Sequence, residues 1–256
     1  MIRNILNDRP TKLFLGISAF FVANALIAES IGTKIFSLEK LLGIAPANFT
    51  LFGESGLGFN LTCGVLLWPL EFIVTDIVNE YYGPKAVKRI SYTAVALICY
   101  AFLMYFAAIG VPPADFWVGV NAGNGVPDMQ AAFSGVFGQN MRIIVGSIVA
   151  FLVSQIVDVT IFHKIKKATG EKKVWLRATG STVVSQFIDS YIVLFIAFLG
   201  VFSWQQILAF GIMNYLYKFT MAIALTPLIY LAERKFERYL GKETATNMKR
   251  AAMGYE

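Results

Sequence analysis

The chain has 256 residues, of which 57% are hydrophobic and only 15% are charged. Soluble domains carry about 25% charged residues, and the mean hydropathy of this chain is +0.62. This composition excludes a disordered chain, a disulfide-stapled secreted module and a nucleic-acid binder, which needs a charged surface for phosphate contacts. The net charge of +6 therefore requires an explanation other than a nucleic-acid partner.

Six apolar segments have the length of a membrane span. A helix that crosses a hydrocarbon core of ~30 Å needs about 20 apolar residues. Runs of this length, separated by charged residues or by Pro and Gly clusters, cover 12–31, 61–82, 86–111, 141–163, 174–202 and 205–231. The sequence thus predicts an all-α integral membrane protein whose six transmembrane helices form a single transporter domain, 1–256. Segments 32–60 and 112–140 are then outer loops, and 232–256 is a basic tail.

The lysines and arginines predict the orientation. Most of the 22 lie before the first segment, between the second and third, between the fourth and fifth, and after the sixth. The fourth-to-fifth connection includes Lys166 and Arg177. Because short cytoplasmic loops are enriched in Lys and Arg, we expect both termini in the cytoplasm and the protein in the cytoplasmic (inner) membrane.

Seven charged residues lie within or at the edges of the predicted spans. They are Glu29, Glu71, Asp76, Glu80, Asp158, Asp189 and Lys218. Each costs at least a few kcal/mol at bilayer depth if it is unpaired. These residues therefore favour a polar cavity on a solute path. The alternative is an ion pair of Lys218 with Asp189 or Asp158 that only fixes helix packing.

The first two segments carry the earliest candidates along the chain. Asn24 is nearly central in the first segment. In the second, Asp76, Asn79 and Glu80 are spaced i, i+3 and i+4, which places them on one helix face, whereas Glu71 lies on another. Pro69 removes a backbone donor and predicts a kink beside Glu71. Glu80 is near the cytoplasmic end and ranks below Glu71 and Asp76.

The fourth and fifth segments repeat the pattern Ser-Gln-x-x-Asp. It begins at Ser154, with Gln155 and Asp158, and again at Ser185, with Gln186 and Asp189. Gln and Asp at i and i+3 share a helix face, and the two segments run in opposite directions. The repeat therefore predicts a common polar interior and suggests an inverted repeat, which transporters use to form a midplane site.

The sixth segment adds Asn214 and Lys218, which share a face at i and i+4. By count, Lys218 is too central to reach either membrane surface. Carboxylates, amides and one ammonium, together with an aromatic content of 14%, suit a flat heteroaromatic solute. A guanine-like edge is one example, because its N–H groups can donate to a carboxylate and its carbonyl can accept from Lys218 or a Gln amide.

Four stretches carry a resemblance to a known family. Residues 70–89 follow a pattern with Phe72, Thr75, Asp76, Glu80 and Gly83, and further matches lie in 155–162, 175–189 and 215–218. Together they resemble the queuosine precursor transporter family, also described as vitamin-uptake transporters.

The resemblance implies a six-helix bacterial membrane protein. Members import 7-cyano-7-deazaguanine or 7-aminomethyl-7-deazaguanine, precursors of the tRNA nucleoside queuosine. It also implies that the family's polar positions, which here are Asp76, Gln155, Asp158, Asp189 and Lys218, form the substrate site. We add to this site Asn24, Glu71, Asn79, Gln186 and Asn214, on their depth and spacing.

Two other functions remain open from the sequence. One is a substrate-binding subunit of a multi-component vitamin importer, which would bind the solute but need an ATPase partner. The other is an intramembrane aspartyl protease built on Asp158 and Asp189. We expect a transporter rather than an enzyme, with no cofactor and no metal. Its partners are the small-molecule substrate and membrane lipids, not nucleic acid, and the oligomeric state, a homodimer included, is left open.

Overall fold

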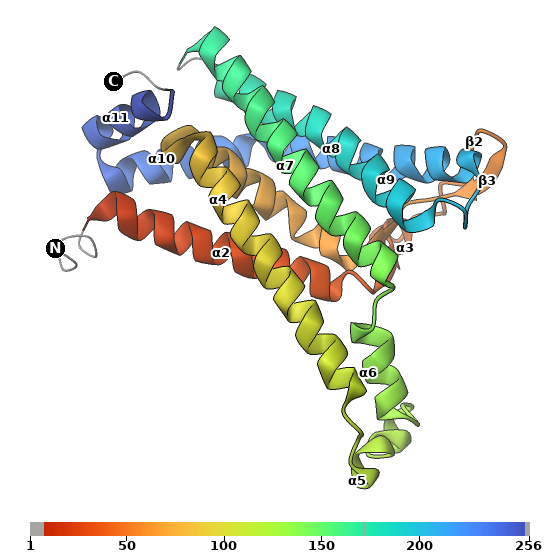
Figure 1. Cartoon of the computed structure of the whole chain (residues 1–256). Helices are drawn as coiled ribbons and strands as arrows, with labels where there is room; N and C mark the ends of the chain where they lie inside the picture. The colour runs from red at the N-terminus through yellow and green to blue at the C-terminus, as the bar shows by residue number, and fades with distance from the viewer. Residues whose placement is uncertain (1–7, 171–172, 254–256) are drawn as a thin grey trace.

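The computed structural model describes residues 8–170 and 173–253, and most of them are helical (Figure 1). Within these residues, five helical stretches are long and apolar enough to cross a membrane. They are α2 (Arg9–Ile31), α4 (Trp68–Gly110), α6 with α7 (Met129–Phe137 and Met141–Thr169), α8 (Val174–Phe198) and α9 (Trp204–Ala224). This confirms the predicted helical, multi-pass membrane architecture.

Helix α4 contains both the second and the third predicted segments. Its 43 residues would extend roughly 65 Å as one straight helix, about twice the hydrocarbon thickness. However, Gly83 has φ 79° and ψ 176°, a conformation that only glycine adopts readily, and Pro84 starts the second half. Figure 1 shows the chain turning back here, between the orange and yellow halves of α4. We call 68–82 the first half and 84–110 the second.

Two sequence expectations about α4 are wrong. The helix begins at Trp68 rather than near Leu61, because Asn60–Thr62 form a strand and Cys63–Leu66 a short 3-10 helix, η1. Pro69 therefore lies in the first turn of α4, where its missing N–H needs no partner. It causes no kink beside Glu71, and the break is at Gly83 instead.

Both predicted outer loops contain small folded elements. Strand β1 (Ile35–Ser37) pairs antiparallel with β4 (Asn60–Thr62), and β2 (Phe49–Leu51) pairs antiparallel with β3 (Glu54–Leu57). Helix α3 (Leu38–Leu42) lies between β1 and β2 in sequence. The segment 112–140 holds α5 (Asp115–Val118), η2 (Ala122–Asn124) and α6.

The predicted sixth segment is divided between two helices. Helix α9 ends at Ala224, and α10 (Thr226–Leu240) begins with Pro227 in its first turn. Helix α11 (Lys242–Met253) follows and packs on α4, where Ala252 lies against Gly83 and Lys249 lies 5.1 Å from the ring of Tyr81. The start of α2, the turn of α4 and the pair α10 and α11 lie at the same end of the molecule (Figure 1).

Helices α7 and α8 form the most extensive helix pair and lie side by side (Figure 1). A Cβ added to Gly146 on α7 would lie 3.2 Å from the backbone oxygen of Val193 on α8. Ala150 and Ser154 follow Gly146 at intervals of four residues and are buried. Membrane helices associate through such small residues because backbones can then approach closely. The close approach places the two Ser-Gln-x-x-Asp motifs opposite each other.

Candidate functional site

The first half of α4 carries a set of buried polar side chains. Its side chains Glu71, Thr75, Asp76, Asn79 and Glu80 are each exposed by 3% or less. Glu71, which the spacing places on a different helix face from the other charged and amide residues, is buried as well, because α2 packs against α4 and Asn24 of α2 contacts Glu71. Polar groups buried to this extent are costly unless they find partners. The partners of these five groups accordingly define the interior of the protein.

The two repeated motifs exchange hydrogen bonds. Ser154 Oγ on α7 donates to Asp189 Oδ1 on α8 at 3.3 Å, and Ser185 Oγ on α8 donates to Asp158 Oδ1 on α7 at 3.1 Å. All four residues are buried. The structure thus brings both copies of the motif to one interior, as their spacing predicts, and each serine serves the carboxylate of the other copy.

Lys218 on α9 forms a buried ion pair with Asp189. Of the two partners that the sequence left open, Asp189 is the one observed. The ammonium also lies 5.8 Å from the centre of the Trp68 ring, close enough for a cation–π contact. Asn214 lies one helical turn earlier on α9 and is half-buried. Asp189 therefore joins α7, α8 and α9 at one point.

Helix α2 contributes contacts at a second point. Asn24 Nδ2 donates to Glu71 Oε1 at 3.0 Å and to the backbone oxygen of Leu67 at 3.1 Å. Further along α2, Glu29 Oε1 accepts from Ser147 Oγ at 2.6 Å. Both predicted carboxylates near α2 thus have a partner on another helix.

A small polar cavity lies between α4, α7 and α8. Its lining residues are Phe72, Thr75, Ser154, Gln155, Asp158, Thr182, Ser185 and Gln186, and its volume is about 10 Å³. This is room for about one water molecule. Three of the predicted site residues, Gln155, Asp158 and Gln186, line this cavity.

Several buried polar atoms of this region have no hydrogen-bond partner among the described residues. They are Glu71 Oε2, both carboxylate oxygens of Asp76, both side-chain polar atoms of Asn79, Gln155 Oε1 and Gln186 Oε1. Most buried polar atoms in native proteins are hydrogen-bonded, so each exception requires an explanation. These atoms belong to five of the predicted site residues, which makes the interior of α4, α7 and α8 the candidate site.

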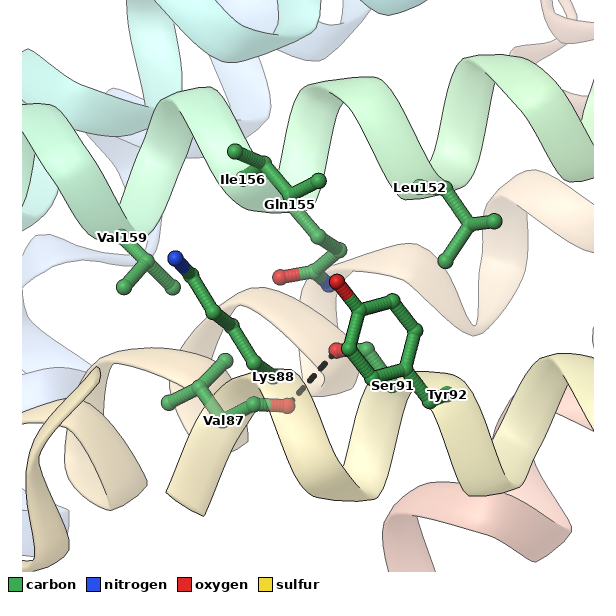
Figure 2. Close-up of a pocket in the computed structure, with 8 residues that line it drawn as sticks. All are labelled: Val87, Lys88, Ser91, Tyr92, Leu152, Gln155, Ile156 and Val159. Carbon is green, nitrogen blue, oxygen red and sulfur yellow. Dashed lines mark hydrogen bonds between the residues drawn. The ribbon is translucent and has the colours of Figure 1, made fainter. Parts of the chain in front are cut away.

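Gln155 lines the small polar cavity and also a second small cavity, which lies between α7 and the second half of α4. Its Nε2 donates weakly to Thr75 Oγ1 at 3.4 Å on the polar side. On the other side, Figure 2 shows its side chain pointing between α7 and the second half of α4, toward Ser91 and Tyr92. Ser91 Oγ donates to Val87 O within its own helix, so it does not satisfy Gln155.

A buried charge cluster near the turn of α4 was missed in the sequence. Arg177 donates to both carboxylate oxygens of Glu80, from Nε at 3.0 Å and from Nη2 at 2.8 Å, and Lys166 Nζ lies 3.3 Å from Glu80 Oε2. Lys166 and Arg177 are exposed by 1% and 0%. Counting them as cytoplasmic loop charges was wrong, because α7 extends to Thr169 and α8 begins at Val174. Glu80 itself is exposed by only 2%.

The site can therefore offer carboxylate and amide acceptors, amide donors and one ammonium. Trp68 and Phe72 add a stacked aromatic pair with ring centres 6.4 Å apart. Within residues 8–170 and 173–253, no group of three His, Cys, Asp or Glu side chains is arranged to hold a metal ion. The arrangement suits hydrogen bonding to a small polar solute.

Comparison with known proteins gives consistent results. The sequence model of the family described as "Putative vitamin uptake transporter" matches residues 62–232. A "Probable queuosine precursor transporter" of Bacillus subtilis (strain 168) is 30% identical over 179 residues, which cover 69% of this chain and 73% of the relative. The "Queuosine precursor transporter" of Escherichia coli (strain K12) is 28% identical over 163 residues, 63% of this chain and 66% of that protein.

A third relative extends over more of the chain. It is the "Probable queuosine precursor transporter" of Haemophilus influenzae, 23% identical over 229 residues, which cover 86% of both chains. No solved structure matches the protein.

Proposed function

Because this chain belongs to the vitamin uptake transporter family that includes the queuosine precursor transporters, we propose that it imports 7-deazaguanine bases. The substrates are 7-cyano-7-deazaguanine, 7-aminomethyl-7-deazaguanine or both. In this proposal each half of α4 crosses the membrane, which gives six spans, and both termini are cytoplasmic. The substrate site consists of Asn24, Glu71, Asp76, Asn79, Gln155, Asp158, Gln186, Asp189, Asn214 and Lys218.

The unpartnered polar atoms in the interior of α4, α7 and α8 carry this proposal, and those of Gln155 and Gln186 belong to residues that line the small cavity. A buried group without a partner costs about 1–3 kcal/mol, and a ligand that supplies the partner recovers that cost. A guanine-type edge presents two adjacent N–H donors to a carboxylate such as Asp76, and a carbonyl acceptor to an amide such as Gln155 or Gln186. The ring faces can stack on Phe72. A site that hydrogen-bonds its substrate in this way also rejects analogues that leave these groups unpaired.

Within this site, Asp158, Asp189 and Lys218 have a second role in the proposal. Each already has a partner on a neighbouring helix, so they hold α7, α8 and α9 together around the cavity. The volume of about 10 Å³ is far below the roughly 300–1,000 Å³ of ligand pockets. Substrate therefore binds when α4 moves relative to α7 and α8, as in transporters that rock around a central site.

The protease alternative finds no support in this geometry. An aspartyl protease needs two carboxylates that share a proton. Here Asp189 is paired with Lys218, and Asp158 and Asp189 each accept a hydrogen bond from a serine of the opposite helix.

Uptake by the purified chain tests the proposal. Proteoliposomes that contain only this protein are expected to accumulate labelled 7-cyano-7-deazaguanine in preference to guanine and to common vitamins. Asp76→Asn keeps the shape but removes the charge, and we expect it to lower uptake at least tenfold. The matched control is Asp115→Asn, at an exposed acid of α5, which should leave uptake unchanged.

Two outcomes would contradict the proposal. Accumulation only after an ATPase partner is added would identify a binding subunit rather than a self-sufficient carrier. Normal uptake by Asp76→Asn would show that the interior of α4 is not the substrate site.

A further inference from the structure

An apolar groove lies on the surface between α2, the first half of α4 and α10. Its volume is about 370 Å³, within the range of small-molecule pockets. Residues of all three helices line it, among them Lys12, Gly16, Phe20, Ile73, Phe236 and Tyr239. The groove lies on the opposite side of α4 from the polar cavity, because Ile73 and Ile77 face the groove while Thr75 faces the cavity.

The groove has one charged end and one apolar end. Lys12 and Tyr239 lie where α2 begins and α10 ends, whereas Phe20 and Val74 lie deeper. From Lys12 to Phe20 the helix rises roughly 12 Å, close to the ~15 Å depth of one hydrocarbon leaflet. The shape therefore suits a long apolar chain with a polar group at one end.

The mouth of the groove is basic. Arg9 Nη1 donates to the backbone oxygen of Tyr239 at 3.3 Å, beside the exposed Lys12. The acid nearest in sequence, Asp8, caps α2 by accepting from Thr11 N at 2.9 Å. A negatively charged head group would thus meet Arg9 and Lys12.

The acidic and basic side chains of α10 differ in their exposure. Glu233 and Glu237 both pair with Lys249 of α11, and the Glu233 side chain is the more buried of the two. The basic residues of α10, Arg234, Lys235 and Arg238, are exposed. The fully exposed charges of α10 are therefore basic, which favours anionic lipids near the membrane surface.

Gly16 lies beside open space in the groove. A Cβ added to Gly16 would meet no atom within 4 Å, so packing against other helices does not require glycine here. Within a helix, glycine is less favourable than alanine. The open space beside Gly16 is part of the groove itself.

From these observations we propose that the groove binds one acyl chain of an anionic phospholipid, whose head group contacts Arg9 and Lys12. This site is separate from the proposed substrate site. The lipid would fill the space between α2 and α10 and hold α10 against the first half of α4.

Lipid binding to the detergent-purified protein tests this site. The probes are phosphatidylglycerol and phosphatidylcholine with identical acyl chains, measured by native mass spectrometry and by the shift in Tm. We expect phosphatidylglycerol to bind at least tenfold more tightly and to raise Tm more. Gly16→Leu, which fills the groove, and Lys12→Gln, which removes a head-group contact, are each expected to weaken that binding at least tenfold.

Matched controls separate the groove from general effects. Gly135→Leu alters a helical glycine of α6 whose Cβ would also meet no neighbour, and Lys167→Gln removes an exposed lysine of α7. Both should bind phosphatidylglycerol like the unmodified protein. Gly16→Ala adds one methyl group to the groove and should retain binding, which shows that the fold tolerates a side chain there. Equal binding of the two lipids, or undiminished binding by Gly16→Leu, would overturn the proposal.

Discussion

Ser154 on α7 donates a hydrogen bond to Asp189 on α8 at 3.3 Å. The contact has a counterpart, because Ser185 on α8 donates to Asp158 on α7 at 3.1 Å. Sliding or rotating α7 against α8 would break both contacts and leave two buried carboxylates without these donors. The two helices therefore move as one unit, and we expect any opening of the site to occur between this unit and α4.

The exchanged hydrogen bonds should stabilise the protein measurably. We expect Ser154→Ala and Ser185→Ala each to lower the free energy of unfolding by about 1.5–3 kcal/mol, the range for hydrogen bonds to charged groups. The measurement is denaturant-induced unfolding in detergent. Ser91→Ala is the control, since this buried hydroxyl donates to Val87 O within its own helix. An equal loss for Ser91→Ala would argue against a special role of the exchange.

Replacing Lys218 alone should lower the stability of the protein more than replacing both Lys218 and Asp189. Lys218→Met leaves a buried carboxylate without its cation, and we expect a loss of about 3–5 kcal/mol in unfolding free energy. The double variant Lys218→Met with Asp189→Asn should recover part of that loss. If it regains stability but not uptake, the pair also acts in transport. Lys235→Met, at an exposed lysine, should change neither quantity.

The turn of α4 should tolerate no side chain. Gly83 has a positive φ, and a Cβ there would lie 3.4 Å from the backbone oxygen of Ala252. Gly83→Ala is therefore expected to lower the unfolding free energy by about 1–3 kcal/mol. Gly110→Ala, at the end of the same helix in open surroundings, should be neutral. A thermal unfolding series of both variants checks this, and an unchanged Tm for Gly83→Ala would contradict it.

Glu80 should require arginine rather than any cation at position 177. Lysine cannot donate to both carboxylate oxygens in the observed forked geometry, nor does it replace the contact from Arg177 Nη1 to Gly170 O. We predict that Arg177→Lys lowers the unfolding free energy by about 1–3 kcal/mol. Arg89→Lys, at an exposed arginine, is the reference. Identical unfolding curves for the two variants would show that charge alone suffices.

The sequence predicts those parts of the polar interior that follow from the spacing of residues along one helix. The spacing within Ser-Gln-x-x-Asp places both copies on inward faces, and the depth of Lys218 required an anionic or polar partner. The break at Gly83 and Pro84 was equally readable, because these residues end helices by their own backbone properties. The kink predicted at Pro69 was wrong because the effect of proline depends on its position in the helix. The start of the helix was predicted too early, so Pro69 was placed in its interior instead of its first turn.

The cluster of Glu80, Lys166 and Arg177 could not be read from local patterns. The rule that assigns basic residues to cytoplasmic loops counts charges along the chain, but does not show how far a helix continues past its apolar part. Helix α7 continues beyond its apolar segment to Thr169, which brings Lys166 inside. The partner of each residue is 86 or 97 positions away in sequence, so only the tertiary fold reveals the pairing.

The contact of α11 with the turn of α4 also bears on biogenesis. Ala252, from the last described helix, lies against Gly83, and Lys249 lies beside Tyr81. A ribosome makes these residues about 170 positions after the turn they cover, at roughly 5–20 residues per second. The turn of α4 is therefore made well before the helix that covers it, and its packing is completed only once α11 has been synthesised.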